Sequence, residues 1–272
     1  MRSISLMYHD VVPRHQRDSS GFPGRDAELY KLTPEQFRNH IQSIRTAIKN
    51  RPLIAPNLKA LPSHGRSLFI TFDDGGISAF TTIADILEEA GWRGHFFVTA
   101  GYIGRRSFLN VDQIRELHRR GHVIGSHSLT HPQRMSRLSW NEMIEEWTAS
   151  VQILSDILGK QVRVASVPGG FYSKQVARAA AQCGIEVLFT SEPTTSSRVV
   201  DGCTVLGRYV IQRWTRPETA AAIAAGDVAP RLRQMIYWNA KKALKAIAGD
   251  HYSKARRSPL VSVLEKASGE QR

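Results

Sequence analysis

The strongest constraint on the fold is a repeated alternation of short β-rich runs with longer runs of helical apolar spacing. The β-rich runs cover residues 67–72, 95–99, 122–125, 162–166 and 186–190, and the helical runs cover residues 77–90, 111–120, 139–158 and 172–183. Each helical run is followed by glycine, which adopts the left-handed conformation of a helix C-cap at little cost. Strands that alternate with helices form a parallel sheet with the helices outside it. The sequence therefore predicts an α/β fold, in which the carboxyl ends of the strands carry the chemistry.

Further elements flank this alternation. Residues 3–8 are predicted as a first strand and residues 204–210 as a last one. The polar insertion between the first two strands, residues 13–66, contains a predicted helix over 33–49. That helix has Thr, Pro and Gln at its N-cap, first-turn and capping-box positions. We predict one α/β domain over residues 1–226, which includes the first strand and the insertion, and a basic amphipathic helix and tail over 227–272. Helices are expected at residues 216–225 and 230–248.

The charge of the chain is concentrated at its C-terminal end. The 272 residues carry a formal net charge of +13, and the ten basic and three acidic residues from Ala229 onward contribute +7 of it. One face of the predicted helix over 230–248 is apolar, with lysines on another face. The apolar face consists of Leu232, Ile236, Ala240, Leu244 and Ile247. Three interpretations stay open, namely a solvated helix and tail, an anionic membrane surface or acidic polymer, and nucleic acid. Nucleic acid is the least supported, because no recognition motif accompanies the charge.

Cysteine content and apolar runs exclude several classes of protein. Cys183 and Cys203 are the only cysteines, so a disulfide-stapled scaffold and a four-cysteine zinc ribbon are excluded. No run approaches the roughly 18 apolar residues of a membrane span. Residues 4–8 are too short for a signal-peptide core and lead into His9 without a cleavage site. We therefore expect a cytoplasmic protein, attached peripherally to the inner face of the membrane if the basic helix binds lipid.

Two adjacent carboxylates, Asp73 and Asp74, follow the strand over 67–72. Burial of two neighbouring acids is costly unless a cation or hydrogen-bond donors compensate. Gly75 and Gly76 allow a tight turn that directs both carboxylates into the mouth of the sheet. The alternative interpretation is an Asp-Asp-Gly-Gly turn without chemistry.

Two histidines, His127 and His131, follow the strand over 122–125. Their spacing of four would place both imidazoles on one face of a helical turn. Two imidazoles and one carboxylate suit zinc or another divalent first-row metal, with positions open for water and substrate. The second carboxylate is then available to take a proton from that water. A surface histidine pair without a metal is the alternative.

Together, these two motifs resemble those of the polysaccharide deacetylases of NodB-homology type, carbohydrate esterase family 4. The resemblance covers about residues 67–210. It implies a distorted (β/α) barrel with fewer than eight strands and hydrolysis of N-acetyl, less often O-acetyl, groups. It implies that Asp73 is the general base, that Asp74 and both histidines bind the metal, and that the metal is zinc, with cobalt, nickel and manganese as alternatives.

The later motifs of the family are altered in this chain. The third normally begins with arginine, and Ser166 stands at that position. Pro168 and Gly169 remain, so the Gly169 N–H is implied as an oxyanion donor, with Tyr172 beside it in the substrate site. The fourth motif, normally rich in aspartate, reads Thr-Ser-Glu-Pro at residues 190–193. In the fifth motif, arginine replaces the histidine that normally serves as general acid.

Two hypotheses compensate for these changes. Residues 6–11 resemble the N-terminal strand of the poly-N-acetylglucosamine deacetylase branch, in which a histidine at the strand end is the acid. By this resemblance His9 protonates the leaving amine, with a structural strand-end histidine as the alternative. In the second hypothesis Arg208, the arginine of the fifth motif, braces Asp73 in place of the missing arginine.

The remaining histidines and aromatic residues have weaker assignments. His95 and His122 are expected to be structural, because they stand at strand starts. For Trp214 and Tyr172 both sugar stacking and packing stay open. No G-x-S-x-G sequence is present, so a serine nucleophile is not expected. Packing roles are expected for Trp92, Trp140 and Trp147.

The sequence thus predicts a metal-dependent hydrolase that removes N-acetyl groups from an amino-sugar glycan or lipid-linked saccharide in exopolysaccharide or envelope assembly. The alternative is a catalytically silent carbohydrate-binding protein of the same fold, suggested by the altered third and fifth motifs. Retention of both aspartates and both histidines argues against that alternative.

Overall fold

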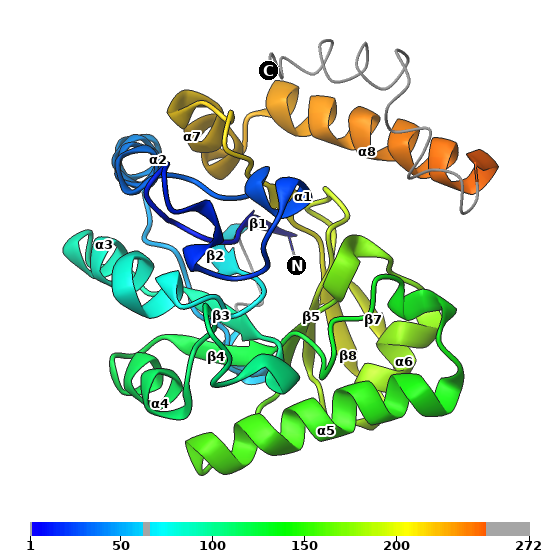
Figure 1. Ribbon diagram of the computed structural model, residues 1–272. Helices are drawn as coiled ribbons and strands as arrows, with labels where there is room; N and C mark the ends of the chain where they lie inside the picture. The colour runs from blue at the N-terminus through cyan, green and yellow to red at the C-terminus, as the bar shows by residue number, and fades with distance from the viewer. Residues whose placement is uncertain (1, 62–65, 249–272) are drawn as a thin grey trace.

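The structure is a computed structural model that describes residues 2–61 and 66–248, and the side chains of these residues other than 58, 66 and 241–248. Within these residues the strands lie at the centre and the helices α2 to α7 surround them (Figure 1). The tail of the predicted C-terminal segment, residues 249–272, and the side chains of Leu244 and Ile247 lie outside the described part.

The described strands form a single curled sheet in the order β7-β8-β6-β5-β4-β3-β2-β1-β9. Every neighbouring pair is parallel except β7 and β8. The α/β barrel-like fold is confirmed, although the sheet has nine strands rather than fewer than eight. The strands are β1 Arg2–Tyr8, β2 Arg66–Phe72, β3 His95–Val98, β4 Val123–Ser126, β5 Val164–Ser166, β6 Val187–Phe189, β7 Arg198–Val200, β8 Cys203–Leu206 and β9 Tyr209–Val210.

The two margins of the sheet are joined by only two residues. β8 pairs with β6 near one margin, whereas β9 pairs with β1 at the other. The single strand predicted over 204–210 is therefore wrong, because the chain crosses between the margins at Gly207 and Arg208. A Cβ on Gly207 would lie 2.4 Å from the carbonyl oxygen of Glu192, so only glycine fits there. This crossing links the two margins of the curled sheet.

The predicted helices are present, and their capping signals explain their starts. Thr33 and Gln36 form the expected capping box before α2, and Ser139 forms one with Glu142 before α5. The helix predicted over 77–90 begins instead as a π-helical turn, Ala79–Ile83, that continues into α3. The helices are α1 Arg25–Glu28, α2 Pro34–Ala47, α3 Ala84–Glu89, α4 Val111–Arg119, α5 Trp140–Leu158, α6 Lys174–Gln182, α7 Pro217–Ala225 and α8 Val228–Ala248. Among the described residues, no helix combines the length and the apolar character needed to span a membrane.

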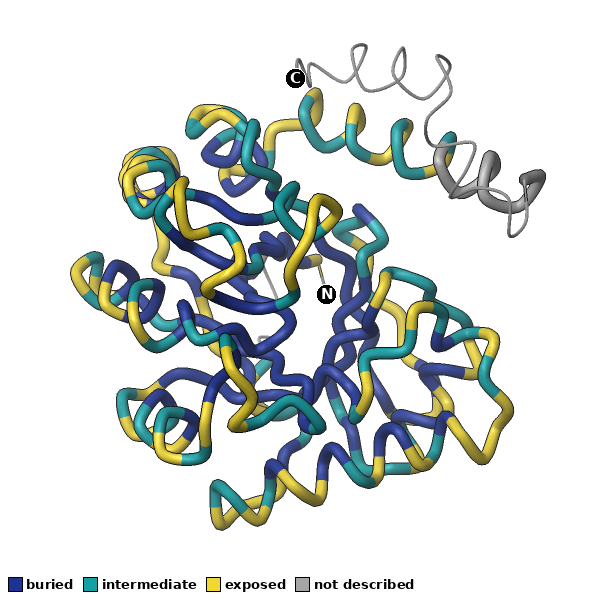
Figure 2. The backbone as a smooth tube through the Cα atoms, in the orientation of Figure 1, coloured by how far each residue is buried: buried dark blue, intermediate teal, exposed yellow. Residues whose placement is uncertain are grey.

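The strands at the centre of the molecule are largely buried (Figure 2). The two faces of the sheet bury different sets of residues. The outer face packs against the helices and forms the main core, to which β2 contributes Leu68, Ile70 and Phe72. The inner face forms a smaller cluster with an aromatic centre, in which Phe69 and Phe97 lie 5.8 and 5.4 Å from Phe189 between ring centroids. This aromatic layer fills the inside of the curled sheet, and the polar residues discussed next lie at the carboxyl ends of the same strands.

Candidate metal centre and active site

The two aspartates are presented by a strained turn after β2. Asp74 has a φ of 76° and Gly75 a φ of 80°, both in the left-handed region. A Cβ on Gly75 would lie 3.1 Å from atoms of Val98, so the turn fits closely against β3. Both aspartates are buried. Non-glycine residues in this conformation persist only where their surroundings hold them, which is common at functional sites.

The two histidines lie on an irregular loop after β4, so the predicted helical turn is wrong. Ser128 and His131 have left-handed φ values of 66° and 58°. The buried carboxylate of Glu146, on α5, accepts hydrogen bonds from the backbone N–H groups of Leu129 and Thr130, both at 2.9 Å. This loop, rather than a helix, brings the rings of the two histidines to 5.0 Å between centroids.

Asp74, His127 and His131 form a group that can hold a metal ion, with one ligand atom of each within 4.8 Å of the others. Asp74 Oδ1 lies 3.5 Å from His127 Nε2 and 3.4 Å from His131 Nε2. Ligand atoms at ordinary metal bond lengths occupy corners about 3.4 Å apart in a tetrahedron, so these spacings fit a single ion. Burial raises the pKa of Asp74, but hydrogen bonds from the two histidines outweigh it and hold the pKa well below the usual range.

Ser166 fixes the orientation of His127. The Nδ1 atom of His127 lies 2.6 Å from Ser166 Oγ and 3.1 Å from the Ser166 carbonyl oxygen. A proton on Nδ1 that is shared with these acceptors leaves Nε2 free to bind a cation, as is usual for metal-ligating histidines. The residue at the position of the family's missing arginine is therefore part of the site.

Asp73 is held by Arg208 through both carboxylate oxygens. Arg208 Nη1 donates to Oδ1 at 2.6 Å and Nη2 to Oδ2 at 2.7 Å. Arg208 is itself fully buried and also donates to the carbonyl oxygen of Thr190 at 3.0 Å. Burial would raise the pKa of Asp73, but Arg208 and His127 outweigh it and lower the pKa below its ordinary value. The predicted contact between Arg208 and Asp73 is present, and it keeps Asp73 ionised 4.0 Å from His127 Nε2.

Asp73, Asp74, His127 and His131 line one pocket of about 540 Å³. His9 lies in the same pocket, with its ring 4.7 Å from that of Tyr30 between centroids. The Nδ1 atom of His9 is buried and has no hydrogen-bond partner among the described residues. Gly169 also lines the pocket with a φ of 66°, and a Cβ there would lie 2.5 Å from the Gln133 carbonyl oxygen. The structure therefore brings together the predicted base, acid, metal ligands and oxyanion donor.

Other predicted positions lie elsewhere. Tyr172 does not line this pocket, because its ring packs against the core and under the guanidinium of Arg198 at 4.6 Å. Pro168 is buried behind the lining residues Val167 and Gly169. Trp214 is also absent from the lining.

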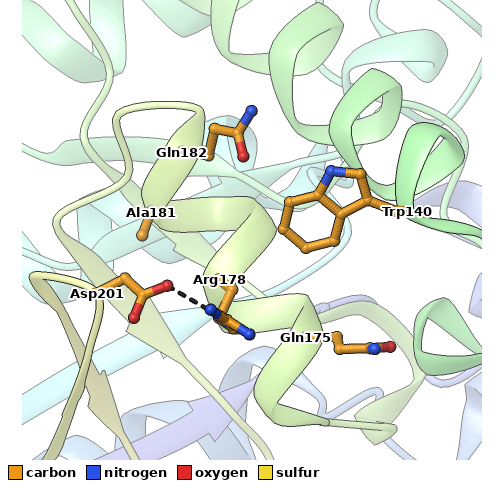
Figure 3. Close-up of a pocket in the computed structure, with 6 residues that line it drawn as sticks. All are labelled: Trp140, Gln175, Arg178, Ala181, Gln182 and Asp201. Atoms are coloured by element: carbon orange, nitrogen blue, oxygen red, sulfur yellow. Dashed lines mark hydrogen bonds and ion pairs between the residues drawn. The ribbon is translucent and has the colours of Figure 1, made fainter.

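The structural roles expected for two histidines and three tryptophans agree with the structure, with one exception. His95 accepts a hydrogen bond from the Ala55 N–H at 3.0 Å, and His122 accepts one from the Gly94 N–H at 3.1 Å. Trp92 and Trp147 are buried, whereas the expectation for Trp140 is wrong, since it is 40% exposed. Trp140 lines a separate pocket of about 440 Å³ beside the Arg178–Asp201 ion pair, with no lining residue in common with the metal pocket (Figure 3).

The insertion supplies a wall of the site that the sequence did not reveal. Phe22 packs on the ring of His131 with centroids 4.7 Å apart. The segment before it is held by Lys31, which is 1% exposed and donates to the carbonyl oxygens of Arg17, Ser20 and Phe22 at 2.8, 2.7 and 2.6 Å. A lysine in a polar insertion gives no sequence signal of such burial.

Comparisons with known proteins agree with the fold and the motifs. A family profile described as polysaccharide deacetylase matches residues 60–188, which contain both motifs. The chain is 27% identical over 128 residues to the peptidoglycan-N-acetylmuramic acid deacetylase PdaA of Bacillus subtilis, covering 46% of this chain and 47% of PdaA. It is 31% identical over 129 residues to a chitooligosaccharide deacetylase of Bradyrhizobium sp., covering 46% of this chain and 56% of that protein. The chain thus spans about half the length of the curated relatives it matches.

The fold has solved counterparts as well. The deacetylase PplD of Streptococcus pyogenes, solved in complex with acetate, superposes with a TM-score of 0.66 at 18% identity. The superposition covers 80% of this chain and 96% of PplD, and at this identity it concerns the fold alone. Both motifs lie inside the matched segment and converge at the carboxyl ends of the strands, and we conclude that residues 60–188 form a segment of the polysaccharide deacetylase family.

Proposed function

We propose that this protein is a metal-dependent hydrolase that removes the N-acetyl group from an amino sugar of a glycan. The observation that carries the proposal is the set of Asp74, His127 and His131, whose ligand atoms have the spacing for one ion beside the ionised Asp73. The two curated relatives named above, which act by name on N-acetylmuramic acid in peptidoglycan and on chito-oligosaccharides, support an amino-sugar substrate.

Asp73 is the proposed general base. A divalent ion bound by Asp74, His127 and His131 would polarise the acetyl carbonyl and increase the acidity of the attacking water. The carboxylate of Asp73 takes a proton from that water as its oxygen bonds to the carbonyl carbon. Arg208 holds both carboxylate oxygens, which keeps the base ionised and fixed in direction.

His9 and Gly169 complete the proposed reaction. The Gly169 N–H donates to the carbonyl oxygen as negative charge develops on it. When the carbon–nitrogen bond breaks, His9 gives a proton to the amine nitrogen. The place of His9 in the pocket supports this role, as does the lack of a hydrogen-bond partner for its Nδ1 atom among the described residues. One water is consumed, and acetate and a free amino sugar are formed.

We propose zinc as the ion, with cobalt, nickel and manganese as alternatives that suit the same nitrogen and oxygen donors. Acetate release from chito-oligosaccharides, with and without a chelator and after re-addition of each metal, tests the proposal. We expect release that a chelator abolishes and zinc restores, together with about one metal ion per chain. Oligosaccharide binding without acetate release from the metal-loaded protein would favour the catalytically silent alternative.

We also propose that α8 attaches the protein to an anionic membrane surface, where a lipid-linked saccharide in exopolysaccharide or envelope assembly would be the substrate. One side of α8 exposes apolar side chains next to the exposed Arg233, an amphipathic arrangement that suits the lipid interface. The exposed apolar residues are Val228 at 68%, Leu232 at 44%, Met235 at 40% and Ile236 at 60%.

Vesicle cosedimentation tests the membrane proposal. Binding should require phosphatidylserine, fall steeply with salt, and be lost in the double variant Leu232→Ser/Ile236→Ser. Ile153, which is 37% exposed on α5, provides a matched control, since Ile153→Ser should bind like the wild type. Binding that is indifferent to salt and to the double variant would refute this proposal.

A further inference from the structure

The side of α8 opposite its exposed apolar residues forms part of the metal pocket. Gln234, Tyr237 and Trp238 line the same pocket as Asp73, Asp74 and His131. These α8 residues lie outside the segment 60–188 that matches the family profile. They are therefore a feature of this chain that the family assignment does not explain.

α8 is fixed to the sheet at the point where the pocket opens. The side-chain amide of Gln234 donates to the carbonyl oxygen of Val210 at 2.7 Å, and the Val210 N–H donates back to it at 3.1 Å. Val210 ends β9, which pairs with β1 at the margin of the sheet. A pair of hydrogen bonds of this kind holds the helix in one register against the sheet.

Tyr237 and Trp238 follow Gln234 by three and four residues, so they lie on the same face of the helix as that anchor. Both side chains are partly buried. Because Gln234 holds the helix in place, the two rings already line the pocket. Little conformational entropy is then lost when a ligand binds against them. A pocket of about 540 Å³ falls within the range of sites for whole small ligands.

Pyranose rings combine flat faces of C–H groups with a rim of hydroxyls. Tyrosine and tryptophan match this chemistry, since each has a broad apolar face and one polar group at its edge. The pocket also contains the amides of Gln133, Gln212 and Gln234, which can pair with hydroxyls at the rim of a sugar.

We propose that Tyr237 and Trp238 form a pyranose-binding subsite that holds a sugar ring of the glycan beside the metal site. This inference rests on the proposed deacetylation of an amino-sugar glycan. It adds that the protein selects oligomeric over monomeric substrates, because the monomer cannot occupy both the metal site and the subsite.

The test measures binding separately from turnover. The variant Asp73→Asn, which lacks the proposed base, is titrated by calorimetry with zinc present, using N-acetylglucosamine and its pentamer as ligands. Adding Trp238→Ala or Tyr237→Ala should weaken pentamer binding about tenfold and leave monomer binding unchanged. Trp238→Phe, which keeps an aromatic face, should bind within about threefold of the parent. Trp140→Ala, which removes the partly exposed tryptophan of the separate pocket, is the matched control and should bind normally.

Metal content and thermal unfolding of each variant show that the fold and the metal site are intact. In the background with Asp73 intact, Trp238→Ala should raise KM for the pentamer while kcat changes little. If the wild type deacetylates the pentamer and both alanine variants bind it normally, the subsite is refuted while the proposed function stands. Loss of pentamer binding in Trp140→Ala instead would place binding in the other pocket and also refute the subsite. If the Asp73→Asn variant does not bind the pentamer and the wild type does not deacetylate it, both proposals fail.

Discussion

At the scale of single residues, the site depends on one buried pair of opposite charges. Asp73 and Arg208 are 135 residues apart in the sequence, yet both carboxylate oxygens are paired with one guanidinium. Removal of one partner from a buried pair leaves an uncompensated charge, which costs far more than loss of a surface pair. Substitution of Arg208 should therefore have a larger effect than substitution of an arginine in a surface ion pair.

The variant Arg208→Lys should lower kcat by about a hundredfold or more, because an ammonium cannot hold both oxygens and leaves the base misdirected. Metal content should not change, since Arg208 contacts Asp73 and not the three proposed metal ligands. Arg178→Lys alters an ion pair whose partners are each 54% exposed, and it should leave kcat unchanged. Steady-state kinetics with metal analysis of both variants provide the comparison, and equal kcat values would remove Arg208 from the reaction.

His9 is the second residue that can be tested alone. His9→Ala should lower kcat by about 10²- to 10⁴-fold, the usual contribution of a positioned proton donor. Zinc should still bind stoichiometrically, because His9 is not one of the three residues that can hold the ion. His15 is exposed nearby in sequence, so His15→Ala serves as the control and should retain full turnover. Turnover of His9→Ala equal to the wild type would exclude it as the acid.

At the scale of elements, period-two alternation along the strands brings the site together. Side chains at every second position of a strand share one face of the sheet. On β2, one series of alternate positions runs from Phe69 to Asp73, just beyond the end of the strand. On β5, another contains Val164 and Ser166. The aromatic layer inside the curled sheet therefore lies below a polar layer at the rim.

Much of this could be predicted from the sequence, because strand runs, glycine caps and capping boxes are local signals. The helices that begin after Thr33 and Ser139 were predictable for that reason. The conformation of the loop at His127–His131 was not, since it depends on hydrogen bonds that backbone N–H groups of the loop donate to Glu146 on α5. The break at Gly207 also depends on a remote contact, with Glu192, so a continuous strand was predicted in its place.

The hydrogen bonds of Glu146 lead to a prediction at this scale. Glu146→Ala leaves the N–H groups of Leu129 and Thr130 without their acceptor and should loosen the histidine loop. Zinc affinity should fall about 10- to 100-fold, as for other residues that orient metal ligands. Chelator competition measures the affinity without reference to activity. Glu145→Ala removes the exposed neighbouring carboxylate and should bind zinc normally, and equal affinities in the two variants would contradict this account.

At the scale of the whole molecule, three histidines outside the site are buried in neutral form. Burial lowers the pKa of His40, His95 and His122 to about 4 each. His40 lies 3.3 Å from the Tyr8 hydroxyl at Nδ1 and 2.9 Å from the Thr215 carbonyl oxygen at Nε2. His95 and His122 each accept a hydrogen bond from a backbone N–H group, which requires the neutral ring. Protonation would place a charge in the core and remove one of these acceptors.

Because these histidines are buried in neutral form, the free energy of unfolding depends on pH at values above those at which carboxylates titrate. Between the ordinary histidine pKa near 6.5 and the folded value of about 4, the unfolded chain binds more protons than the folded one. The free energy of unfolding should therefore fall as the pH falls through this window, by about 1.4 kcal/mol per pH unit for each histidine. Below the folded value, this contribution stops changing.

Urea unfolding of the chelator-treated protein at several pH values between 7.5 and 4.5 measures this slope. The comparison of interest is between the wild type and His40→Gln. The variant lacks one of the three buried imidazoles, and its slope should be smaller by about 1.4 kcal/mol per pH unit over the same window. Parallel lines for the two proteins would mean that His40 is not buried in the neutral form, and the packing of α2 against β1 around it would have to be revised.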